Sequence, residues 1–210
     1  MNTLVSFLRK NYYKERLLVK DKFRLLITTV LSQRTRDENT DAAAKRLFSV
    51  AKTPKQTARL SKKRLEELIK SSGTYRQKAK HIKEISKIIN EKYNSRVPQT
   101  REELLSLPGV GYKTADIVLS YGYGVPTIAV DTHVNRIPKR IGIVPEKTKL
   151  EEARLILEAL TPKKDRFVVN LGLVRFGQEI CRPIGPKCQV CELNRICNYG
   201  IRLLRSKNNQ

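Results

Sequence analysis

The sequence predicts an all-α protein, and two observations support this prediction. Apolar residues recur every three or four positions along most of the 210 residues, and no convincing alternation of a half-buried strand interrupts them. Glycine, proline and capping residues divide the apolar runs into pieces of helical length. A chain of this length can bury a sizeable core, in one domain or in two small lobes.

The first strongly apolar segment extends from Lys20 to about Ser32. It is too apolar for a surface helix, so we expect a core helix that ends at a polar edge. The loop 32–37 that follows carries hydrogen-bonding and cationic side chains. A second helix is expected through Ala42, Ala43, Ala44, Leu47 and Phe48.

A short third helix is expected to begin at Thr53 and Pro54, because proline is tolerated in the first turn of a helix. Gly73 is the expected C-cap of the helical pattern that follows, which is formed by Leu65, Leu68 and Ile69. The next helix is amphipathic, and its apolar face is made of Ile82, Ile85, Ile88 and Ile89. Its other face carries Lys80, Lys83, Lys87 and Lys92. Thr100 and Glu103 then match a capping box that opens a short helix.

A glycine-rich hairpin at residues 107–111 joins this short helix to another, and Lys113 lies on the first turn of the second helix. Because Gly109 and Gly111 have no Cβ, the backbone can turn tightly and approach another surface. The unpaired N–H groups and the positive dipole end at the start of the second helix suit a phosphate. The same glycines also fit a helix–turn–helix corner that serves only packing. The second helix continues through Ala115, Ile117, Val118 and Leu119.

In the C-terminal half, Asp131 is the expected N-cap of a helix that Pro138 should end or kink. Thr148 and Glu151 match another capping box, which opens a helix that reaches Leu160. The last long apolar helix before the cysteines contains Phe167, Val168, Leu171, Leu173, Val174 and Phe176. Only the tail at residues 206–210 has a composition typical of disorder.

The formal net charge is +23, from 43 Lys and Arg against 20 Asp and Glu. This excess indicates a polyanionic partner. Nucleic acid is favoured over a membrane, because the sequence has no long apolar run, signal peptide or amphipathic anchor. We therefore expect a cytoplasmic, monomeric protein associated with the nucleoid of a prokaryote. Charge alone does not separate an enzyme from a packaging protein, and only two histidines are present, which disfavours a His-rich metal site.

All four cysteines lie in the last 30 residues, in the order Cys181, Cys188, Cys191 and Cys197. Without a secretion signal, this cluster indicates metal ligation rather than two disulfides. Four thiolates can bind one Zn²⁺ ion or one iron–sulfur cluster. The spacing contains one C-x2-C pair where zinc ribbons usually have two, so an iron–sulfur cluster is favoured over zinc.

Three motifs follow one another at specific separations. They are Leu107-Pro108-Gly109-Val110-Gly111 with Lys113, then Ile128-Ala129-Val130-Asp131-Thr132-His133 with Asp131 eighteen positions after Lys113, and the C-x6-C-x2-C-x5-C tail. Together they resemble the endonuclease III family of base excision repair DNA glycosylase/AP lyases, over nearly the whole chain from about Leu25 to Cys197.

The resemblance implies a two-lobe helix–hairpin–helix DNA glycosylase fold. One lobe would be a six-helix barrel domain at residues 16–125, with the helix–hairpin–helix at about 100–122. The other would be an iron–sulfur domain made of residues 1–15 plus 126–210. In that domain the four cysteines would hold a [4Fe-4S] cluster.

The resemblance also implies two catalytic residues. The amine of Lys113 would attack C1′ of the damaged nucleotide and form a Schiff base, after which β-elimination breaks the strand on the 3′ side. Asp131 would stabilise the positive charge that develops on the sugar and manage protons. Both residues have ordinary explanations as well, since a lysine in a basic chain often binds phosphate and an aspartate before Thr-His often only caps a helix.

The target base cannot react inside the stack, so the enzyme must flip it out and fill the gap. By resemblance, Gln33 would enter the stack and the loop 73–75 would supply a wedge from the other strand. The family commonly has leucine at the wedge position, where this chain has Thr74, and Tyr75 is the alternative wedge. The residues expected to contact DNA are Gln33, Arg34, Thr74, Tyr75, Pro108, Gly109, Val110, Gly111, Thr114 and His133.

The implied function is excision of oxidised pyrimidines from double-stranded DNA, with cleavage of the strand at the abasic site. Two alternatives stay open: a glycosylase for thymine or uracil opposite guanine, and a non-catalytic helix–hairpin–helix DNA-binding protein. Excision of adenine opposite oxidised guanine is disfavoured, because those relatives usually lack a lysine at the position of Lys113. The non-catalytic hypothesis explains the charge and the hairpin, but not Lys113 together with Asp131.

Overall fold

Every regular element of the computed structural model is a helix among the residues that it describes, which are 1–13 and 18–208. This confirms the predicted all-α class. The chain forms two compact units, Met1–Arg16 with Pro126–Gln210 and Leu17–Val125. None of the helices in the described residues combines the length and the apolar composition that a membrane span requires.

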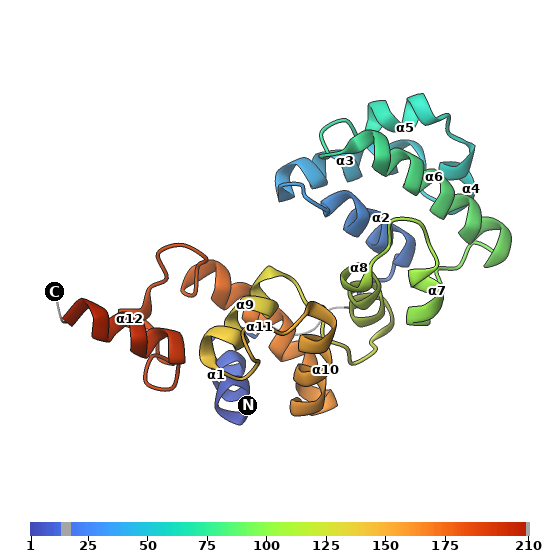
Figure 1. Ribbon diagram of the computed structural model, residues 1–210. Helices are drawn as coiled ribbons and strands as arrows, with labels where there is room; N and C mark the ends of the chain where they lie inside the picture. The colour runs from blue at the N-terminus through green and yellow to red at the C-terminus, as the bar shows by residue number, and fades with distance from the viewer. Residues whose placement is uncertain (14–17, 209–210) are drawn as a thin grey trace. The chain divides into compact units, whose positions relative to one another are not determined.

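Figure 1 shows the order of the helices along the chain. The unit Leu17–Val125 contains α2 (Lys22–Ser32), α3 (Asp37–Val50), α4 (Pro54–Arg59), α5 (Lys62–Leu68), α6 (Tyr75–Lys92), α7 (Arg101–Leu105), α8 (Tyr112–Ile117) and a π-helical segment, η1 (Val118–Tyr123). The other unit contains α1 (Asn2–Asn11), α9 (Thr132–Ile141), α10 (Leu150–Leu160), η2 (Lys163–Asp165), α11 (Arg166–Glu179), η3 (Cys188–Val190) and α12 (Asn198–Asn208).

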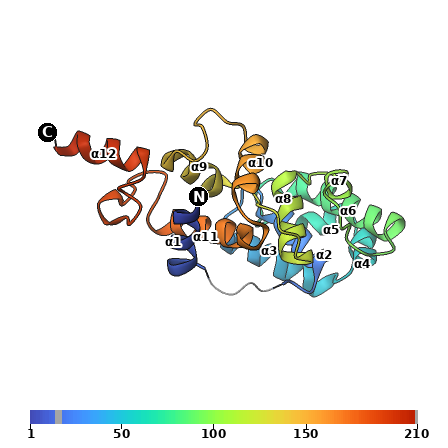
Figure 2. The ribbon, with the colours of Figure 1, turned by 90° about the horizontal axis from the view of Figure 1, so that it is seen from below.

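The N-terminal helix α1 packs against α11, and the two lie side by side in both views (Figure 1 and Figure 2). Leu4 and Leu8 of α1 are buried in the same core as Leu173 and Phe176 of α11. A Cβ on Gly172 would lie 2.9 Å from the Cβ of Leu8, so the glycine lets the two helices approach closely. Burial of α1 explains why this unit combines the two ends of the chain.

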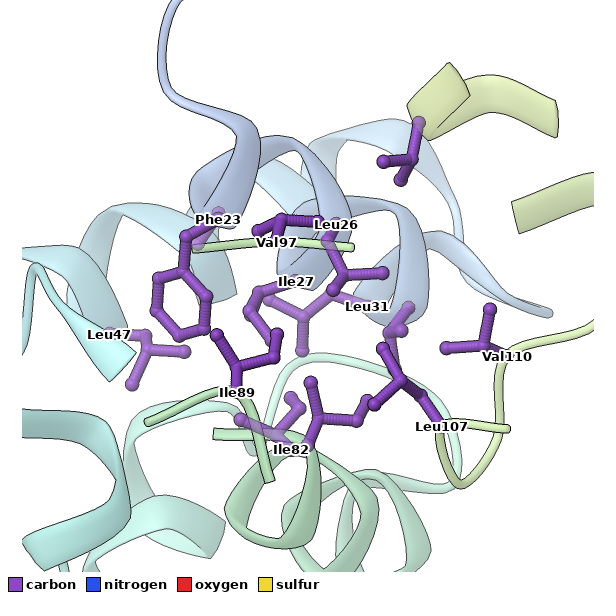
Figure 3. Packing of buried hydrophobic residues seen from close by; sticks show 14 of the residues in the cluster. Phe23, Leu26, Ile27, Leu31, Leu47, Ile82, Ile89, Val97, Leu107 and Val110 are labelled. Atoms are coloured by element: carbon purple, nitrogen blue, oxygen red, sulfur yellow. The ribbon is translucent and has the colours of Figure 1, made fainter. Parts of the chain in front are cut away.

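The core of the unit Leu17–Val125 is organised around α2, which confirms the expected core helix. Figure 3 shows α2 side chains such as Ile27 and Leu31 directed toward a cluster that includes Ile82, Leu107 and Val110. Ile27, Leu31 and Ile82 are fully buried. Because Leu107 and Val110 anchor the hairpin in this core, its backbone is held close to the end of α2.

Gly73 does not cap the helix before it, so that prediction is wrong. α5 ends at Leu68, and Ile69 is its C-cap. A Cβ on Gly73 would lie 2.8 Å from the backbone oxygen of Arg34. The glycine therefore permits a close approach of two loops rather than the end of a helix.

Pro138 does not end α9, although proline is unfavourable inside a helix. The helix continues to Ile141, and its C-cap is Gly142, whose φ is +99°. Ile137 and Ile141 on either side of the proline are buried in the core. Their burial outweighs the one backbone hydrogen bond that proline cannot make.

The capping box predicted at Thr148 is also wrong, because α10 begins at Leu150 with Lys149 as its N-cap. Thr148 is instead buried, and its carbonyl accepts a hydrogen bond from Nζ of Lys139 at 2.7 Å. Disorder is also predicted for residues 206–210. This prediction is wrong for residues 206–208, because α12 extends to Asn208. Residues 209 and 210 lie outside the described residues.

The capping box at Thr100 forms only in part. Thr100 does cap α7, because its hydroxyl accepts from the backbone N–H of Glu103 at 3.3 Å. The Glu103 carboxylate binds the Thr100 hydroxyl at 2.8 Å, however, and not the backbone N–H of Thr100. The interaction is therefore a side-chain pair rather than the reciprocal box.

An ion pair ties the two helices on either side of the hairpin. Arg101 in α7 donates to Oδ1 of Asp116 in α8 through Nε at 2.9 Å and Nη2 at 2.6 Å. Asp116 is only 1% exposed. A carboxylate so deeply buried depends on its cationic partner, because desolvation penalises the charged form.

We expect Arg101→Met to lower the free energy of unfolding by about 3 kcal/mol, because it leaves a buried carboxylate without its guanidinium. The exposed pair of Arg64 and Glu67 supplies a matched control. Arg64→Met should change the same quantity by less than about 1 kcal/mol. Urea unfolding measures the free energy of unfolding of both variants. Equal effects of the two substitutions would contradict the structural role of the buried pair.

Candidate functional site

The hairpin 107–111 turns at Gly109, which has a φ of +74°. A Cβ on Gly109 would lie 2.2 Å from Nδ1 of His81, so the turn needs glycine for both its conformation and its packing. Gly111 is different, since no atom lies within 4 Å of the place where its Cβ would be. The backbone at Gly111 therefore borders open space. Val110, between them, is buried, which leaves only its backbone for an external contact.

Lys113 lies on the first turn of α8 and its side chain is exposed. Gly111 is the N-cap of this helix and provides no side-chain cap. The first turn of α8 therefore presents backbone N–H groups together with an accessible amine. Thr114, the next residue, is only 3% exposed.

Gln33 follows the last residue of α2 and reaches across to the hairpin. Its Nε2 donates to the carbonyl oxygen of Gly109 at 2.9 Å and to Oγ1 of Thr114 at 3.3 Å. The structure thus brings together three residues that the sequence analysis expects at the DNA: Gln33, Gly109 and Thr114.

Arg34 and Thr74 lie on two loops that contact each other. Both residues are exposed and both have a positive φ, +49° and +54° respectively. The backbone N–H of Gly73 donates to Oγ1 of Thr35 at 3.0 Å, which links the loops directly. Tyr75 begins α6 and is half-buried against the core of its unit.

Lys78 is a further residue of this region that the sequence analysis did not select. It is 3% exposed, and its Nζ donates to the carbonyl oxygen of Gln33 at 2.6 Å. Burial lowers the pKa of Lys78 from 10.5 to about 8. Its spacing in the sequence could have indicated this burial. Lys78 precedes Ile82 by four positions and so lies on the apolar face of α6, whereas Lys80 and Lys83 do not lie on that face.

In the other unit, Asp131 is the N-cap of α9, as predicted. Its Oδ1 accepts from the backbone N–H groups of His133 at 2.9 Å and Val134 at 2.8 Å. These bonds and the helix dipole hold the carboxylate at the start of the helix. The side chain is partly exposed.

His133 lies on the first turn of α9, against α11. A Cβ on Gly177 would lie 2.3 Å from Nδ1 of His133, so the glycine makes room for the ring. Nη2 of Arg136 lies 3.1 Å from the same Nδ1 and donates to the carbonyl oxygen of Cys181 at 2.9 Å. Arg136 thus connects α9 to the segment that begins the cysteine cluster, a link that the spacing of the sequence did not reveal.

All four cysteines line one small cavity. Apolar side chains complete its wall, among them Ile137, Ile141, Phe176 and Leu193. Each cysteine is half-buried and none is in a disulfide. Burial raises the pKa of the Cys191 thiol. Within residues 1–13 and 18–208, no three His, Cys, Asp or Glu side chains are placed to share a single metal ion.

Arg140 holds the segment that contains the first cysteine. Its Nη1 donates to Sγ of Cys181 at 3.4 Å and to the carbonyl oxygen of Arg182 at 2.7 Å. Its guanidinium lies 4.4 Å from the ring centroid of Tyr199. At the other end of the cluster, the backbone N–H of Gly200 donates to Sγ of Cys197 at 3.4 Å. Such donors stabilise negative charge on sulfur.

Comparison with known proteins shows extensive similarity. The family described as "HhH-GPD superfamily base excision DNA repair protein" matches residues 27–163. The endonuclease III of Thermotoga maritima is 52% identical over 179 residues, which cover 85% of this chain and 84% of that protein. A structure of a trapped endonuclease III–DNA covalent intermediate is 35% identical, covers 97% of each chain and has a TM-score of 0.90. A structure of a thermostable thymine-DNA glycosylase is 26% identical, covers 96% of this chain and 94% of that chain, and has a TM-score of 0.81.

Proposed function

Because the chain belongs to the HhH-GPD superfamily of base excision DNA repair proteins, we propose that it excises oxidised pyrimidines from double-stranded DNA and cleaves the strand at the abasic site. It is a DNA glycosylase and AP lyase of the endonuclease III type. The observation that carries the proposal for the site is the exposed Lys113 on the first turn of the helix after the glycine hairpin. Its amine is accessible to a bound nucleotide, as a nucleophile must be.

The hairpin and the basic surface bind the duplex. The net charge of +23 attracts the phosphate backbone. At Gly111, no side chain separates the backbone from an approaching phosphate. Contacts of this kind position the protein on DNA without reading its sequence. Because the partner is double-stranded DNA, we propose that the protein works at the nucleoid.

Lys113 acts as the nucleophile. The lone pair of its neutral amine attacks C1′, and the N-glycosidic bond breaks as the base leaves with a proton. The sugar ring opens to give a Schiff base between Nζ and C1′. Loss of a proton from C2′ then expels the phosphate from C3′, and this β-elimination cleaves the strand on the 3′ side.

Asp131 supplies the carboxylate that the reaction needs. Departure of the base leaves positive charge on the sugar, and a fixed carboxylate stabilises that charge. Oδ1 already accepts two backbone N–H groups. We therefore assign Oδ2 to the sugar and to proton transfer, while Oδ1 keeps the side chain in place.

Gln33 and the loop with Thr74 fill the gap left by the flipped nucleotide. Thr74 and Arg34 are exposed, and the Gln33 side chain is held by two hydrogen bonds, one to the hairpin and one to α8, that a DNA base can replace. Thr74 buries less apolar surface than the leucine common in the family. Tyr75 is partly buried at the start of α6, so Thr74 is the better placed of the two for the wedge.

The cysteines support a [4Fe-4S] cluster as the cofactor. Four thiols around one small apolar cavity provide the ligand set that such a cluster requires. The N–H donors from Arg140 and Gly200 offset the charge of the thiolates. When bound, such a cluster would cross-link residues 181–197 and stabilise the fold of this segment.

The purified protein should be brown and contain about four iron atoms and four sulfides per chain. Cys188→Ser should lose colour and iron, because serine is a poor ligand for iron in such a cluster, whereas Gln189→Ala on the same short turn should keep both. Metal analysis and visible absorption measure this. A colourless protein with one zinc per chain would contradict the assignment.

A second candidate is excision of thymine mispaired with guanine. It is favoured by the similarity to a thymine-DNA glycosylase. The two candidate functions are distinguished by the rates of base release from a duplex that contains thymine glycol and from a duplex that contains thymine opposite guanine. Faster release of thymine glycol supports the first proposal, and faster release of mispaired thymine supports the second. Release of neither, with duplex binding retained, would favour a non-catalytic protein.

A further inference from the structure

The Lys78 side chain carries an ammonium group that is buried beneath the two loops containing Gln33 and Thr74. The side chain extends from the first turns of α6 into the protein, and the residue is only 3% exposed. Nζ lies within hydrogen-bond distance of four acceptors: the carbonyl oxygens of Leu31 at 2.7 Å and Gln33 at 2.6 Å, Oγ1 of Thr35 at 2.8 Å and Oγ of Ser72 at 2.8 Å. Three N–H donors thus serve four acceptors, one from the last turn of α2 and three from two separate loops.

All four acceptors are uncharged. Burial is the cause of the lowered pKa of Lys78, and no charged neighbour contributes to it. An ammonium group without a carboxylate is unfavourable to bury. An apolar side chain such as methionine would fill the same space at lower cost. Departures from the usual rules of burial are expected at sites that serve function, and the contacts of this ammonium group indicate what it does.

These contacts lie on both sides of a residue in an unusual conformation. Arg34 has a φ of +49°, and Lys78 binds Gln33 before it and Thr35 after it. Thr74 has a φ of +54°, and Lys78 binds Ser72 two residues earlier. Non-glycine residues in the left-handed region persist only where their surroundings hold them. The hydrogen bonds from Lys78 stabilise both loops in these conformations.

The two loops also contact each other above Lys78. The backbone N–H of Gly73 donates to Oγ1 of Thr35, the same atom that accepts from Lys78. A Cβ on Gly73 would lie 2.8 Å from the backbone oxygen of Arg34. The main chain of Gln33 is therefore fixed by Lys78, while its side chain binds the hairpin at Gly109 and α8 at Thr114.

We propose that Lys78 is a positioning residue that holds the Gln33 and Thr74 loops in the arrangement with which they open duplex DNA. The inference rests on the proposed function, in which these loops fill the gap left by the flipped nucleotide. Lys78 is buried and touches no substrate, so it acts only through the loops. Its removal should impair reaction at a nucleotide that must be extruded from a paired duplex, and should spare reaction at a nucleotide that is already unpaired.

The test uses one abasic site in two contexts: within a fully paired duplex, and within a short unpaired bubble flanked by the same duplex. Borohydride trapping rates are measured on both for the unaltered protein and for Lys78→Met. We expect Lys78→Met to lower the rate on the paired substrate by about 10- to 100-fold, because small misplacements of positioning groups cost that much. The rate on the bubble should stay within about twofold.

Lys83→Met is the matched control. Lys83 lies on the same helix and donates to the carbonyl oxygen of Leu60, in a loop that carries none of the residues proposed to contact DNA. It should change neither rate. Thr35→Val is a second variant, since it removes one Lys78 contact and the Gly73 link while keeping the ammonium group, and it should show the same selective loss.

A rate lost equally on both substrates by both variants would show that Lys78 serves only general stability and would overturn the inference. Unchanged rates on both substrates would overturn it as well. Failure of the unaltered protein to form an adduct on either substrate would instead contradict the proposed function. The outcomes for the inference and for the proposed function are therefore distinct.

Discussion

Replacement of Lys113 by glutamine is expected to abolish the borohydride-trapped adduct with DNA and to reduce strand cleavage at an abasic site by on the order of a thousandfold or more. Glutamine retains a polar side chain of similar length but has no nucleophilic amine, so the covalent intermediate cannot form. Lys113 is exposed on the first turn of α8, and its replacement should leave the fold unchanged. Gel analysis of trapped complexes and of cleaved strand measures both effects.

Lys92→Gln provides the control for charge. Lys92 is an exposed residue on the last turn of α6, and its substitution removes the same single positive charge from the basic surface. Both variants should bind duplex DNA with a similar, slightly reduced affinity. Persistence of the adduct in Lys113→Gln at the normal rate would exclude Lys113 as the nucleophile.

Asp131→Asn is expected to slow release of a damaged base by about 10²- to 10⁴-fold, because the amide cannot stabilise positive charge on the sugar or accept a proton as a carboxylate does. The fold should tolerate the change. Asparagine is as good an N-cap as aspartate, so the free energy of unfolding should change by less than about 1 kcal/mol. Single-turnover base release from a thymine glycol duplex and thermal unfolding measure the two quantities.

Asp21→Asn is the matched control for this substitution. Asp21 is the N-cap of α2, and its Oδ1 accepts from the backbone N–H of Arg24 at 2.9 Å, just as Asp131 caps α9. Base release should be unaffected in Asp21→Asn. If both variants slowed base release alike, loss of helix capping would explain the effect of Asp131→Asn, and its assignment as a reacting group would be wrong.

Features that depend on local sequence could be predicted. The density of apolar residues in α2, among them Phe23, Leu26 and Val30, identifies it as a core helix, because a helix too apolar for the surface must be buried. Asp131 before a helical segment identifies an N-cap, because the oxygen that binds the first-turn N–H groups lies only two or three residues away. The positions of the hairpin and of Lys113 at the start of α8 follow from the same local rules.

Features that depend on contacts distant in sequence could not be predicted in this way. In the sequence, Gly73 is typical of a helix end. In the structure, a side chain is excluded at Gly73 because the backbone of Arg34, distant in the sequence, lies against it. Pro138 stays inside α9 because residues around it are buried by other helices. The register of Lys78 on the apolar face of α6 indicates burial, but its hydrogen bonds to Leu31, Gln33 and Thr35, distant in the sequence, could not be predicted.

The role of Lys113 as the nucleophile is tested most directly by locating the residue that becomes attached to DNA. The unaltered protein is reacted with a duplex that carries thymine glycol in the presence of borohydride, the complex is digested, and the modified peptide is identified by mass spectrometry. If Lys113 is the nucleophile, the nucleotide will be attached to Lys113. Attachment to another lysine or to the amino terminus, or excision of the base without any adduct, would contradict this role.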